Sequence, residues 1–474
     1  MLKYISSAGA RIEEVPWVTP EAIFSNIHHM CGALWLDSQK QTQYGQSSFI
    51  AAFPNKLLSG NAEDAPLNLL NTYLKANENP WADLPDNLQE VLPLFRGGIA
   101  GIFGYELGGS LERVKTNGPL IVNGQKIPDL CVGFYPSAMS FDHTAQRCFV
   151  VATGFNDNGL NQNQAAEAQL NQWRSVLEAP KDSNQPPSPI ATVKSNFSRA
   201  QYMQAVSDVI ALICDGEIFQ ANISQSYTGE LEAPDDGFSR YLKMRALNPA
   251  SFGGFFRGEN WNLASNSPER LITLNQNKVS ARPIKGTVTR SQNPIEDQQL
   301  ADQLLMSTKD RAENIMIVDL LRNDLARVCE DSSINVPDLC VLESLAHVHH
   351  LVSTVSGTLR NGQTPIDLLA ACFPGGSVTG APKIRAMDII TDIEQRPRGP
   401  YCGSLGYIGY DGHMDMNILI RSIVQSGSEL VFNVGGGITA QSNPSDEYQE
   451  TLDKAEGVFR AIGLEEKHFQ EKRA

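Results

Sequence analysis

Paired carboxylates lie near the start of a helix that we predict over residues 444–462. Asn443 is a favourable N-cap, and Pro444 fits the first helical position. Glu447 and Glu450 follow three residues apart, so their side chains share one face of the helix. Carboxylate oxygens in this arrangement suit a hard divalent cation such as Mg²⁺. On spacing alone, a solvated acidic face favoured by the helix dipole is the commoner outcome, by roughly three to one.

A second group of acidic residues falls in a helix predicted over Arg311–Val328. Its acidic residues are Asp310, Glu313, Asp319 and Asp324. A metal-binding carboxylate and a solvated helix face both fit this spacing, and the second is again the commoner.

The segment 373–383 (FPGGSVTGAPK) has the composition of an anion-binding turn. Its glycines and hydroxyls run into a helix whose first residue we expect to be Pro382. Such a turn presents free backbone N–H groups at the positive end of a helix. No Gly-Lys-Ser/Thr follows, which favours a carboxylate over a nucleoside triphosphate, with an ordinary tight loop as the alternative. The candidate contacts are Ser377, Thr379, Gly380 and Lys383.

Lys285 and Arg421 are cations in unusual sequence surroundings. Lys285 lies in the segment 282–287 (RPIKGT), downstream of Glu269. A lysine becomes a nucleophile when desolvation or a cationic neighbour lowers its pKa from about 10.4; a lysine beside glycine is otherwise a solvated turn residue. Arg421 falls in an apolar run that we predict to be a buried strand over 417–424, where an arginine needs an acidic partner or an anionic ligand.

The elements that must position these residues are strands interrupted by long helices, which favours an α+β fold. We expect large antiparallel β-sheets in a two-layer, sandwich-like core flanked by helices. The predicted strands are 253–256, 271–275, 351–359, 407–410, 417–424 and 430–434, and the predicted helices are 295–305, 311–328, 382–393 and 444–462.

A polar, proline-containing stretch at 179–197 predicts a division of the chain. We expect an N-terminal region over 1–178, this linker, and a catalytic region over 198–474. Ser198 is a predicted cap for the first helix of the catalytic region, which should end at Asp215 and Gly216.

Composition limits the classes of function. The 474 residues are 41% hydrophobic and carry a net charge of −15, which argues against nucleic acid as a partner. No apolar run approaches the length of a membrane helix, and the first residues lack the apolar core of a signal peptide. The eight cysteines are scattered without metal-binding spacing, so we expect a reduced, cytoplasmic protein.

Taken together, these segments resemble the chorismate-utilising enzymes, namely component I of aminodeoxychorismate synthase and its relatives. The resemblance is dense and in order over residues 198–465. Each motif is modest alone, but their joint occurrence is specific and favours the functional interpretations above over the structural ones. The matching segments are 266–270 (NSPER), 283–287 (PIKGT), 309–324 (KDRAENIMIVDLLRND), 349–353 (HHLVS), 375–383, 401–421, 435–437 (GGG) and 447–451 (EYQET).

One position distinguishes the members of this family. Anthranilate synthases resemble PIAGT where the aminodeoxychorismate enzymes have PIKGT, and this chain has Lys285 there. The resemblance therefore implies amination of chorismate to 4-amino-4-deoxychorismate, a step toward p-aminobenzoate and folate. The alternatives are anthranilate, isochorismate or salicylate synthase, and, in a different class, a non-catalytic scaffold that intact site residues disfavour.

The resemblance also implies roles for individual residues. Mg²⁺, held by Glu313 and Glu450 with Glu447 in support, would bind the ring carboxylate of chorismate. Lys285 would attack C2 while Glu269 protonates the departing C4 hydroxyl, and ammonia would then add at C4 and expel the lysine. The implied substrate-binding positions are Arg421, Tyr401, Gly435, Gly436, Gly437, Asn222 and His350, with Ser377, Thr379, Gly380 and Lys383 from the anion loop.

Two partners follow from the same resemblance. The family takes ammonia from a glutaminase, and because this chain has no Gly-x-Cys-x-Gly nucleophile turn, we expect a separate glutaminase subunit. The N-terminal half matches more loosely the region that forms a tryptophan pocket in relatives, which makes tryptophan an expected ligand. The matching residues are Ser38, Gln46, Ser47, Ser48, Phe49, Ser251, Phe252 and Gly253.

Overall fold

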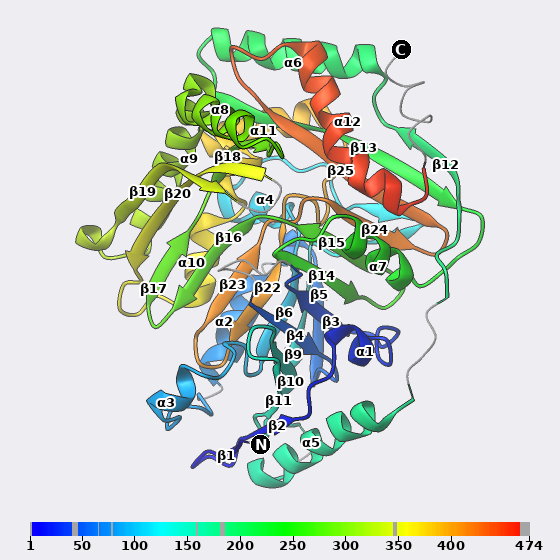
Figure 1. Cartoon of the computed structure of the whole chain (residues 1–474), viewed down its shortest axis with the longest axis vertical. Coiled ribbons are helices and arrows are strands. Elements are labelled where there is room, and N and C mark those ends of the chain that lie inside the picture. Colours follow the sequence, from blue (N-terminus) through cyan, green and yellow to red (C-terminus); the bar gives the residue numbers. More distant parts are fainter. Residues whose placement is uncertain are drawn as a thin grey trace.

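The computed structural model describes residues 2–39, 46–64, 66–76, 79–157, 160–180, 185–344 and 348–464. Two large antiparallel sheets form the centre of the molecule, and helices cover their outer sides (Figure 1). The predicted α+β fold with large antiparallel sheets is therefore confirmed. None of the described helices is long and apolar enough to cross a membrane.

The first sheet combines strands from both halves of the chain. Its spatial order is β1 (Lys3–Ile5), β2 (Arg11–Val15), β11 (Arg147–Ala152), β10 (Ser137–Asp142), β4 (Ser47–Ala51), β3 (Leu34–Asp37), β14 (Phe252–Arg257), β15 (Asn262–Ser267), β24 (Ser422–Ser426), β25 (Glu429–Ile438), β13 (Gln220–Leu231) and β12 (Ile190–Ser195), with β21 (Gly380–Ala381) paired to β13.

The second sheet also mixes the two halves. Its order is β18 (Ile284–Thr289), β20 (Val348–Thr358), β17 (Lys278–Ala281), β16 (Arg270–Asn275), β23 (Met414–Asn417), β22 (Ser404–Gly409), β6 (Gly98–Phe103), β9 (Leu130–Tyr135) and β5 (Lys56–Gly60), with β19 (Asn335–Ser344) paired to β20. A small separate hairpin joins β7 (Ile121–Val122) to β8 (Gln125–Lys126).

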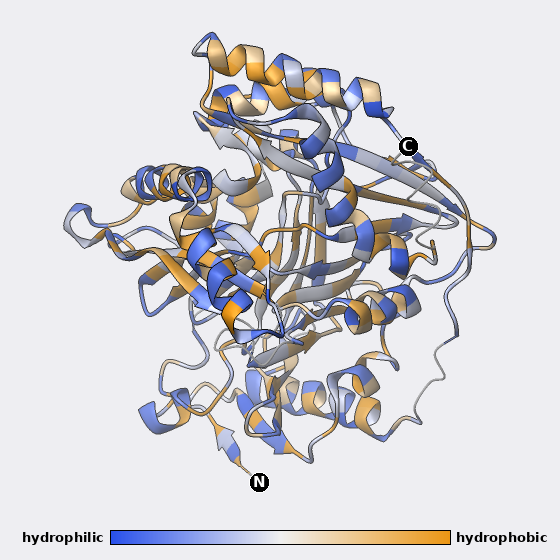
Figure 2. Cartoon of the chain, turned by 45° about the horizontal axis from the view of Figure 1, so that its top comes forward, coloured by the Kyte–Doolittle hydropathy of each residue, from blue (hydrophilic) through white to orange (hydrophobic). Residues whose placement is uncertain are grey.

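The described helices include those that the sequence predicts and several that it does not. They are α1 (Pro20–Phe24), α2 (Pro66–Ala76), α3 (Asp86–Gln89), α4 (Leu107–Glu112), α5 (Gln162–Glu178), α6 (Arg199–Cys214), α7 (Phe238–Leu247), α8 (Pro294–Met306), α9 (Thr308–Ala326), α10 (Pro365–Cys372), α11 (Lys383–Glu394) and α12 (Pro444–Ala461). Ser198 caps α6 with a full capping box, as expected. In Figure 2 the peripheral helices carry both apolar and polar positions, which fits helices that bury one face against a sheet.

Three apolar clusters hold the layers together. One lies between the sheets and includes Ile102 and Tyr407 from one sheet with Phe256 and Val424 from the other. A second packs the β16–β17–β20 region against α9 and α10, and a third packs the first sheet against α5, α7 and α12. Burial of this kind is the main favourable term in folding, at about 25 cal/mol per Å² of apolar surface.

Within the predicted linker 179–197, residues 190–195 form β12, which pairs with β13 in the first sheet. The rest of the segment connects α5 to β12 and β12 to α6, and residues 181–184 lie outside the described residues. Strands from both sides of this connection pair directly: β3 with β14 in one sheet and β6 with β22 in the other. The two regions of the sequence therefore share their sheets.

The predicted strand over 417–424 is wrong. Strand β23 ends at Asn417 in the second sheet, and β24 begins at Ser422 in the first, so the intervening residues carry the chain from one sheet to the other. Arg421 lies in this crossover with φ of 52°, a left-handed conformation that no regular strand contains. The apolar run misled the prediction because Ile418 and Leu419 are buried between the layers without pairing in a strand.

The helix predicted from Pro382 begins one residue later. Pro382 has φ of −63° and ψ of 139°, so it is the N-cap of α11 and Lys383 is the first helical residue. Lys383 therefore lies at the start of the helix, and its side chain pairs with Asp324.

Candidate active site

Strands β13 and β25 form one wall of the site, where three glycines lie in sequence. Gly437 lies opposite Asn222, and Gly435 lies opposite Ser224. A Cβ on Gly436 would lie 3.1 Å from Glu447 Oε2, and a Cβ on Gly437 would lie 2.2 Å from Gln220 Nε2 and 3.7 Å from Lys285 Nζ. The glycines therefore allow carboxylates and the lysine to approach the strand closely.

Lys285 extends from β18 toward this wall. Figure 1 shows β18 on one side, facing β13, β25 and α12 on the other. Its ammonium lies 3.5 Å from the Ser377 carbonyl oxygen and 4.0 Å from Glu313 Oε2. Gly286, next to it, has φ of 82°, and a Cβ there would meet Leu304 at 2.8 Å. The local bend that presents Lys285 thus requires glycine.

Glu269 and Ser377 meet at the base of the site. The Ser377 hydroxyl donates to Glu269 Oε1 at 2.8 Å. Burial raises the pKa of Glu269, opposed by this hydrogen bond and by the charges of Lys285 and Lys454. A carboxyl with a raised pKa is what a general acid requires.

The three predicted metal ligands come from two helices, and two of them, Glu447 and Glu450, lie beside Gly436. Glu313 comes from α9, and Glu447 and Glu450 come from the first turns of α12. Burial raises the pKa values of Glu313 and Glu447, and the neighbouring acidic charges add to the rise. The three carboxylates are therefore near enough to repel one another.

Each of these carboxylates is close to an ammonium group. Lys285 lies 4.0 Å from Glu313, Lys309 lies 3.7 Å from Glu447, and Lys454 lies 2.7 Å from Glu450. Among the described residues no three acidic, histidine or cysteine side chains are gathered as closely as a metal site needs. The lysines balance the acidic charge in this arrangement.

Arg421 lies in the crossover between the sheets, and Tyr401 lies in the turn before β22. Desolvation lowers the pKa of Arg421, and its guanidinium has no hydrogen bond or ion pair with any residue that the structure describes. It lines a cavity of about 180 Å³ together with Asn266 and Lys454. A guanidinium in this setting suits an anionic ligand. Tyr401 is buried, with Arg398 over its ring at 5.7 Å.

Three residues that we predicted to bind an anion in this loop contact other residues of the protein. The Lys383 ammonium is 2.7 Å from Asp324 Oδ2, and both side chains are buried. The Thr379 hydroxyl donates to the Gly375 carbonyl oxygen at 3.0 Å. Gly380 pairs with Ala221 of β13, where a Cβ would lie 2.1 Å from the Gln220 carbonyl oxygen. Of the predicted loop contacts, Ser377 alone has its side chain on Glu269.

Asn222 lies opposite Gly437, and His350 lies opposite Thr287, two residues from Lys285. The Asn222 amide oxygen is buried without a hydrogen-bond partner among the described residues. The His350 imidazole is 2.8 Å from the Thr287 hydroxyl, on the strand that carries Lys285.

Sequence reasoning missed several neighbours of the site. Lys309 and Lys454 were not predicted, although Lys454 follows Glu450 by one helical turn, a spacing that predicts an ion pair. Gln220 was also missed; it is fully buried next to Gly437, and both its amide atoms lack partners in the described part of the chain. Only the strand register reveals that position.

The predicted tryptophan pocket corresponds to a separate cavity of about 460 Å³ between the sheets. Seven of the eight predicted residues line it: Ser38, Gln46, Ser47, Phe49, Ser251, Phe252 and Gly253. Ser48 points elsewhere, since its hydroxyl is 2.7 Å from His143 Nε2 and is fully buried. Arg270 and Asp415, which form an ion pair at 2.8 Å, also line the cavity.

Comparison with known proteins shows which proteins this chain resembles. The family model described as chorismate binding enzyme matches residues 31–460. The chain is 35% identical to aminodeoxychorismate synthase component 1 of Salmonella typhimurium, over 94% of this chain and 97% of that protein. It is 36% identical to anthranilate synthase component 1 of Thermus thermophilus, over 79% of each chain.

Among solved structures, the fold matches anthranilate synthase component I from Streptococcus pneumoniae with a TM-score of 0.74. The sequence identity is 28%, and the match covers 89% of this chain and 93% of that one.

Proposed function

Because the chain belongs to the chorismate binding enzyme family, we propose that it aminates chorismate to 4-amino-4-deoxychorismate, on the way to folate. The observation that carries this choice within the family is Lys285. Its amino group lies beside the wall formed by the three glycines at 435–437, which we call the glycine wall. It is also 3.5 Å from the carbonyl oxygen of Ser377, whose hydroxyl donates to Glu269. The aminodeoxychorismate relative, which aligns over nearly its whole length, supports the same choice.

The proposed chemistry is two successive displacements. The Lys285 nitrogen forms a bond to C2 of the ring, the two ring double bonds shift, and the C4 hydroxyl leaves as water after Glu269 gives it a proton. Ammonia then forms a bond to C4, the double bonds shift back, and the C2–nitrogen bond breaks to release Lys285. Two such steps replace one difficult direct substitution. Glu269 can supply the proton because burial raises its pKa.

Anion-binding groups would hold the substrate during both steps. Chorismate carries two carboxylates, and Arg421 offers a guanidinium with no anionic partner among the described residues. Tyr401 and backbone N–H groups near Gly437 complete this subsite in the proposal. The Arg421 guanidinium would be paired and desolvated further when substrate binds, which favours a tight contact.

Mg²⁺ is the proposed cofactor. Glu313, Glu447 and Glu450 supply the hard oxygen donors that this ion prefers, and burial raises the pKa values of Glu313 and Glu447. When bound, the ion would neutralise the ring carboxylate and orient it. Isothermal titration with Mg²⁺ tests the assignment: Glu450→Gln should weaken binding at least about tenfold, while Glu456→Gln, on the same helix, should not.

A separate glutaminase subunit is the proposed source of ammonia. The Salmonella relative is named as component 1, which implies a second component. All eight cysteines are free, which supports the proposed cytoplasmic location, where thiols stay reduced. Tryptophan remains a predicted ligand of the 460 Å³ cavity, and equilibrium dialysis with tryptophan tests that prediction.

Product identification tests the proposed function directly. The purified chain is incubated with chorismate, Mg²⁺ and ammonium, and the products are separated by chromatography and identified by mass. We expect 4-amino-4-deoxychorismate. Anthranilate, or isochorismate as the sole product, would contradict the proposal and favour another member of the family.

A further inference from the structure

Arg398 is a fully buried arginine just beyond the end of α11. Its guanidinium forms a forked contact with one carboxylate: Nε donates to Glu394 Oε2 at 2.9 Å, and Nη2 donates to Glu394 Oε1 at 2.7 Å. Such planar, two-point pairing fixes the orientation of the guanidinium as well as its position.

The same guanidinium reaches two separate walls of the candidate site. Nη1 donates to the Val378 carbonyl oxygen at 2.9 Å, and Nη2 donates to the Asn222 carbonyl oxygen at 2.7 Å. Val378 follows Ser377, whose hydroxyl holds Glu269. Asn222 lies opposite Gly437 in the glycine wall. One side chain therefore sets the separation between the Glu269 side of the site and the glycine wall.

A second position on the Asn222 strand and the turn that leads to Tyr401 are tied to the same point. Glu394 Oε1 also accepts hydrogen bonds from the Ser224 backbone N–H and hydroxyl, at 2.7 and 2.9 Å. The backbone N–H groups of Arg398 and Gly399 donate to Glu106 at 2.8 and 2.9 Å, which fixes the turn that leads to Tyr401. The Arg398 guanidinium also lies 5.7 Å from the Tyr401 ring centroid.

We propose that Arg398 is a positioning residue for chorismate, which holds the Ser377–Val378 loop, the Asn222 strand and the Tyr401 turn at the separation that the substrate requires. This inference rests on the proposed function. The Arg398 guanidinium donates four hydrogen bonds: two to the Glu394 carboxylate, one to the Val378 carbonyl oxygen and one to the Asn222 carbonyl oxygen. A lysine would keep the charge but has a compact ammonium that cannot span the same acceptors.

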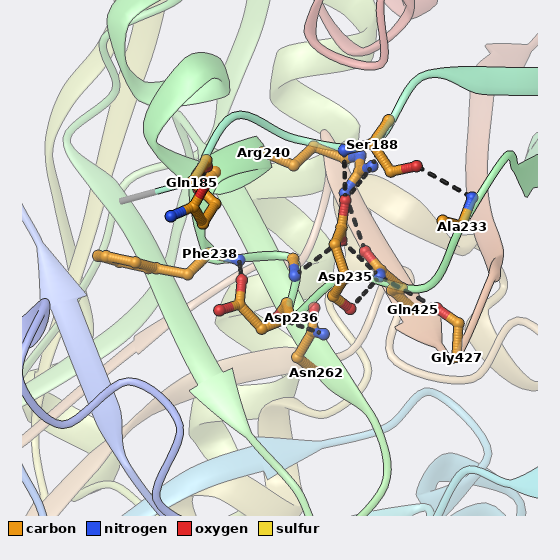
Figure 3. Close-up of polar contacts among 12 residues, drawn as sticks. Gln185, Ser188, Ala233, Asp235, Asp236, Phe238, Arg240, Asn262, Gln425 and Gly427 are labelled. Carbon is orange, nitrogen blue, oxygen red and sulfur yellow. Dashed lines mark hydrogen bonds and ion pairs between the residues drawn. The ribbon is translucent and has the colours of Figure 1, made fainter. Parts of the chain in front are cut away.

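Arg240 on α7 is a matched control. It is equally buried and makes a forked contact with Asp235, with Nη1 to Oδ1 at 3.0 Å and Nη2 to Oδ2 at 3.1 Å. It also donates to the Ser188 carbonyl and to Gln425, as Figure 3 shows. None of these partners is a predicted chorismate or metal residue, so Arg240→Lys removes a similar buried fork without touching the walls of the site.

The experiment compares Arg398→Lys with Arg240→Lys in the whole chain. Chorismate binding is measured by equilibrium dialysis, kcat and KM are measured for chorismate and for ammonium, and Tm is measured for each protein. Small displacements of positioning groups cost on the order of 100-fold in kcat/KM. We therefore expect Arg398→Lys to lower kcat/KM for chorismate about 100-fold and to weaken chorismate binding, with KM for ammonium nearly unchanged. Arg240→Lys should stay within about threefold of the wild type in every kinetic constant.

The possible outcomes separate the two proposals. A wild-type chain that binds no chorismate would contradict the proposed function. A wild type that binds chorismate, with Arg398→Lys and Arg240→Lys equally active, would contradict the inference alone. Should Arg398→Lys not fold, Glu394→Gln tests the same fork from its other side, and the same loss specific to chorismate is expected; unchanged chorismate binding in that variant would also overturn the inference.

Discussion

At the scale of single residues, the surroundings of a side chain decide its chemistry. Lys285 is surrounded by Glu313, the Ser377 carbonyl and the glycine wall, and its side chain is 15% exposed. A substrate that entered this space would displace the remaining water and leave the lysine beside the ring. In the proposed mechanism, contacts from segments far away in the sequence place this lysine for attack.

Lys285→Ala should abolish formation of 4-amino-4-deoxychorismate, or redirect the reaction to another product, because the displacement at C2 loses its nucleophile. The measurement is product analysis with ammonium as the nitrogen source. Lys278→Ala is the control, since Lys278 is an exposed lysine of the same sheet that donates to Thr358. Unchanged product formation by Lys285→Ala would exclude the covalent route.

The raised pKa of Glu269 predicts how the activity depends on pH. As the general acid it must be protonated, and its raised pKa keeps it protonated above the usual carboxyl range. Activity should thus be retained below this raised pKa and should fall as pH rises through it. Glu269→Gln should lower kcat by about 10²–10⁴-fold and remove this descending limb.

The Ser377→Ala variant provides a second test of Glu269 as the titrating group. The Ser377 hydroxyl donates to Glu269 and lowers the pKa of that carboxyl. Its removal should therefore raise this pKa further and move the descending limb of the kcat/KM profile to higher pH. A limb that moves to lower pH would contradict the assignment of Glu269 as the group that titrates.

At the scale of elements, buried ion pairs hold the site-bearing helices in place. Lys383 at the start of α11 pairs with Asp324 in α9 at 2.7 Å. Helix α9 carries Glu313, and α11 follows the loop that carries Ser377. The pair therefore links the predicted metal side of the site to the Glu269 side.

Lys383→Met should cost about 3–5 kcal/mol of unfolding free energy, because it leaves the Asp324 carboxylate buried without its partner. Urea unfolding followed by circular dichroism measures this loss. The double variant Lys383→Met with Asp324→Asn should recover most of it, since no unpaired charge remains. A stable Lys383→Met protein that had lost chorismate affinity would instead support a direct role in substrate binding.

At the scale of the whole molecule, the two halves of the chain cannot separate without breaking both sheets. Strand β3 pairs with β14, and β6 pairs with β22. A cluster between the sheets includes apolar residues from both halves. Cooperative unfolding is the expected result of such shared packing.

The five tryptophans allow a test of this cooperativity, because four of them, Trp17, Trp35, Trp81 and Trp173, precede the connection at 179–197. Their fluorescence should change at the same urea concentration at which chorismate binding and far-ultraviolet circular dichroism are lost. Two separate transitions would show that the N-terminal region and the catalytic region unfold independently.

The sequence by itself determined the family, the fold class and several of the longer helices. Capping residues such as Ser198 and Asn443, and apolar periodicity, are local signals, so they predict α6 and α12 well. Motifs in a fixed order predicted roles for Lys285, Glu269 and the three acidic residues. That information lies along the chain and needs no knowledge of contacts.

Only the tertiary structure decided which of these residues share a site. The crossover at Arg421 reads as a strand because burial between two sheets and burial within one sheet produce the same apolar pattern. Lys383 and Lys285 are both lysines next to glycine-containing loops, yet one pairs with Asp324 and the other faces the glycine wall. The role of Arg398 depends on carbonyls up to 176 positions away. Long-range contacts of this kind leave no periodic trace in the sequence.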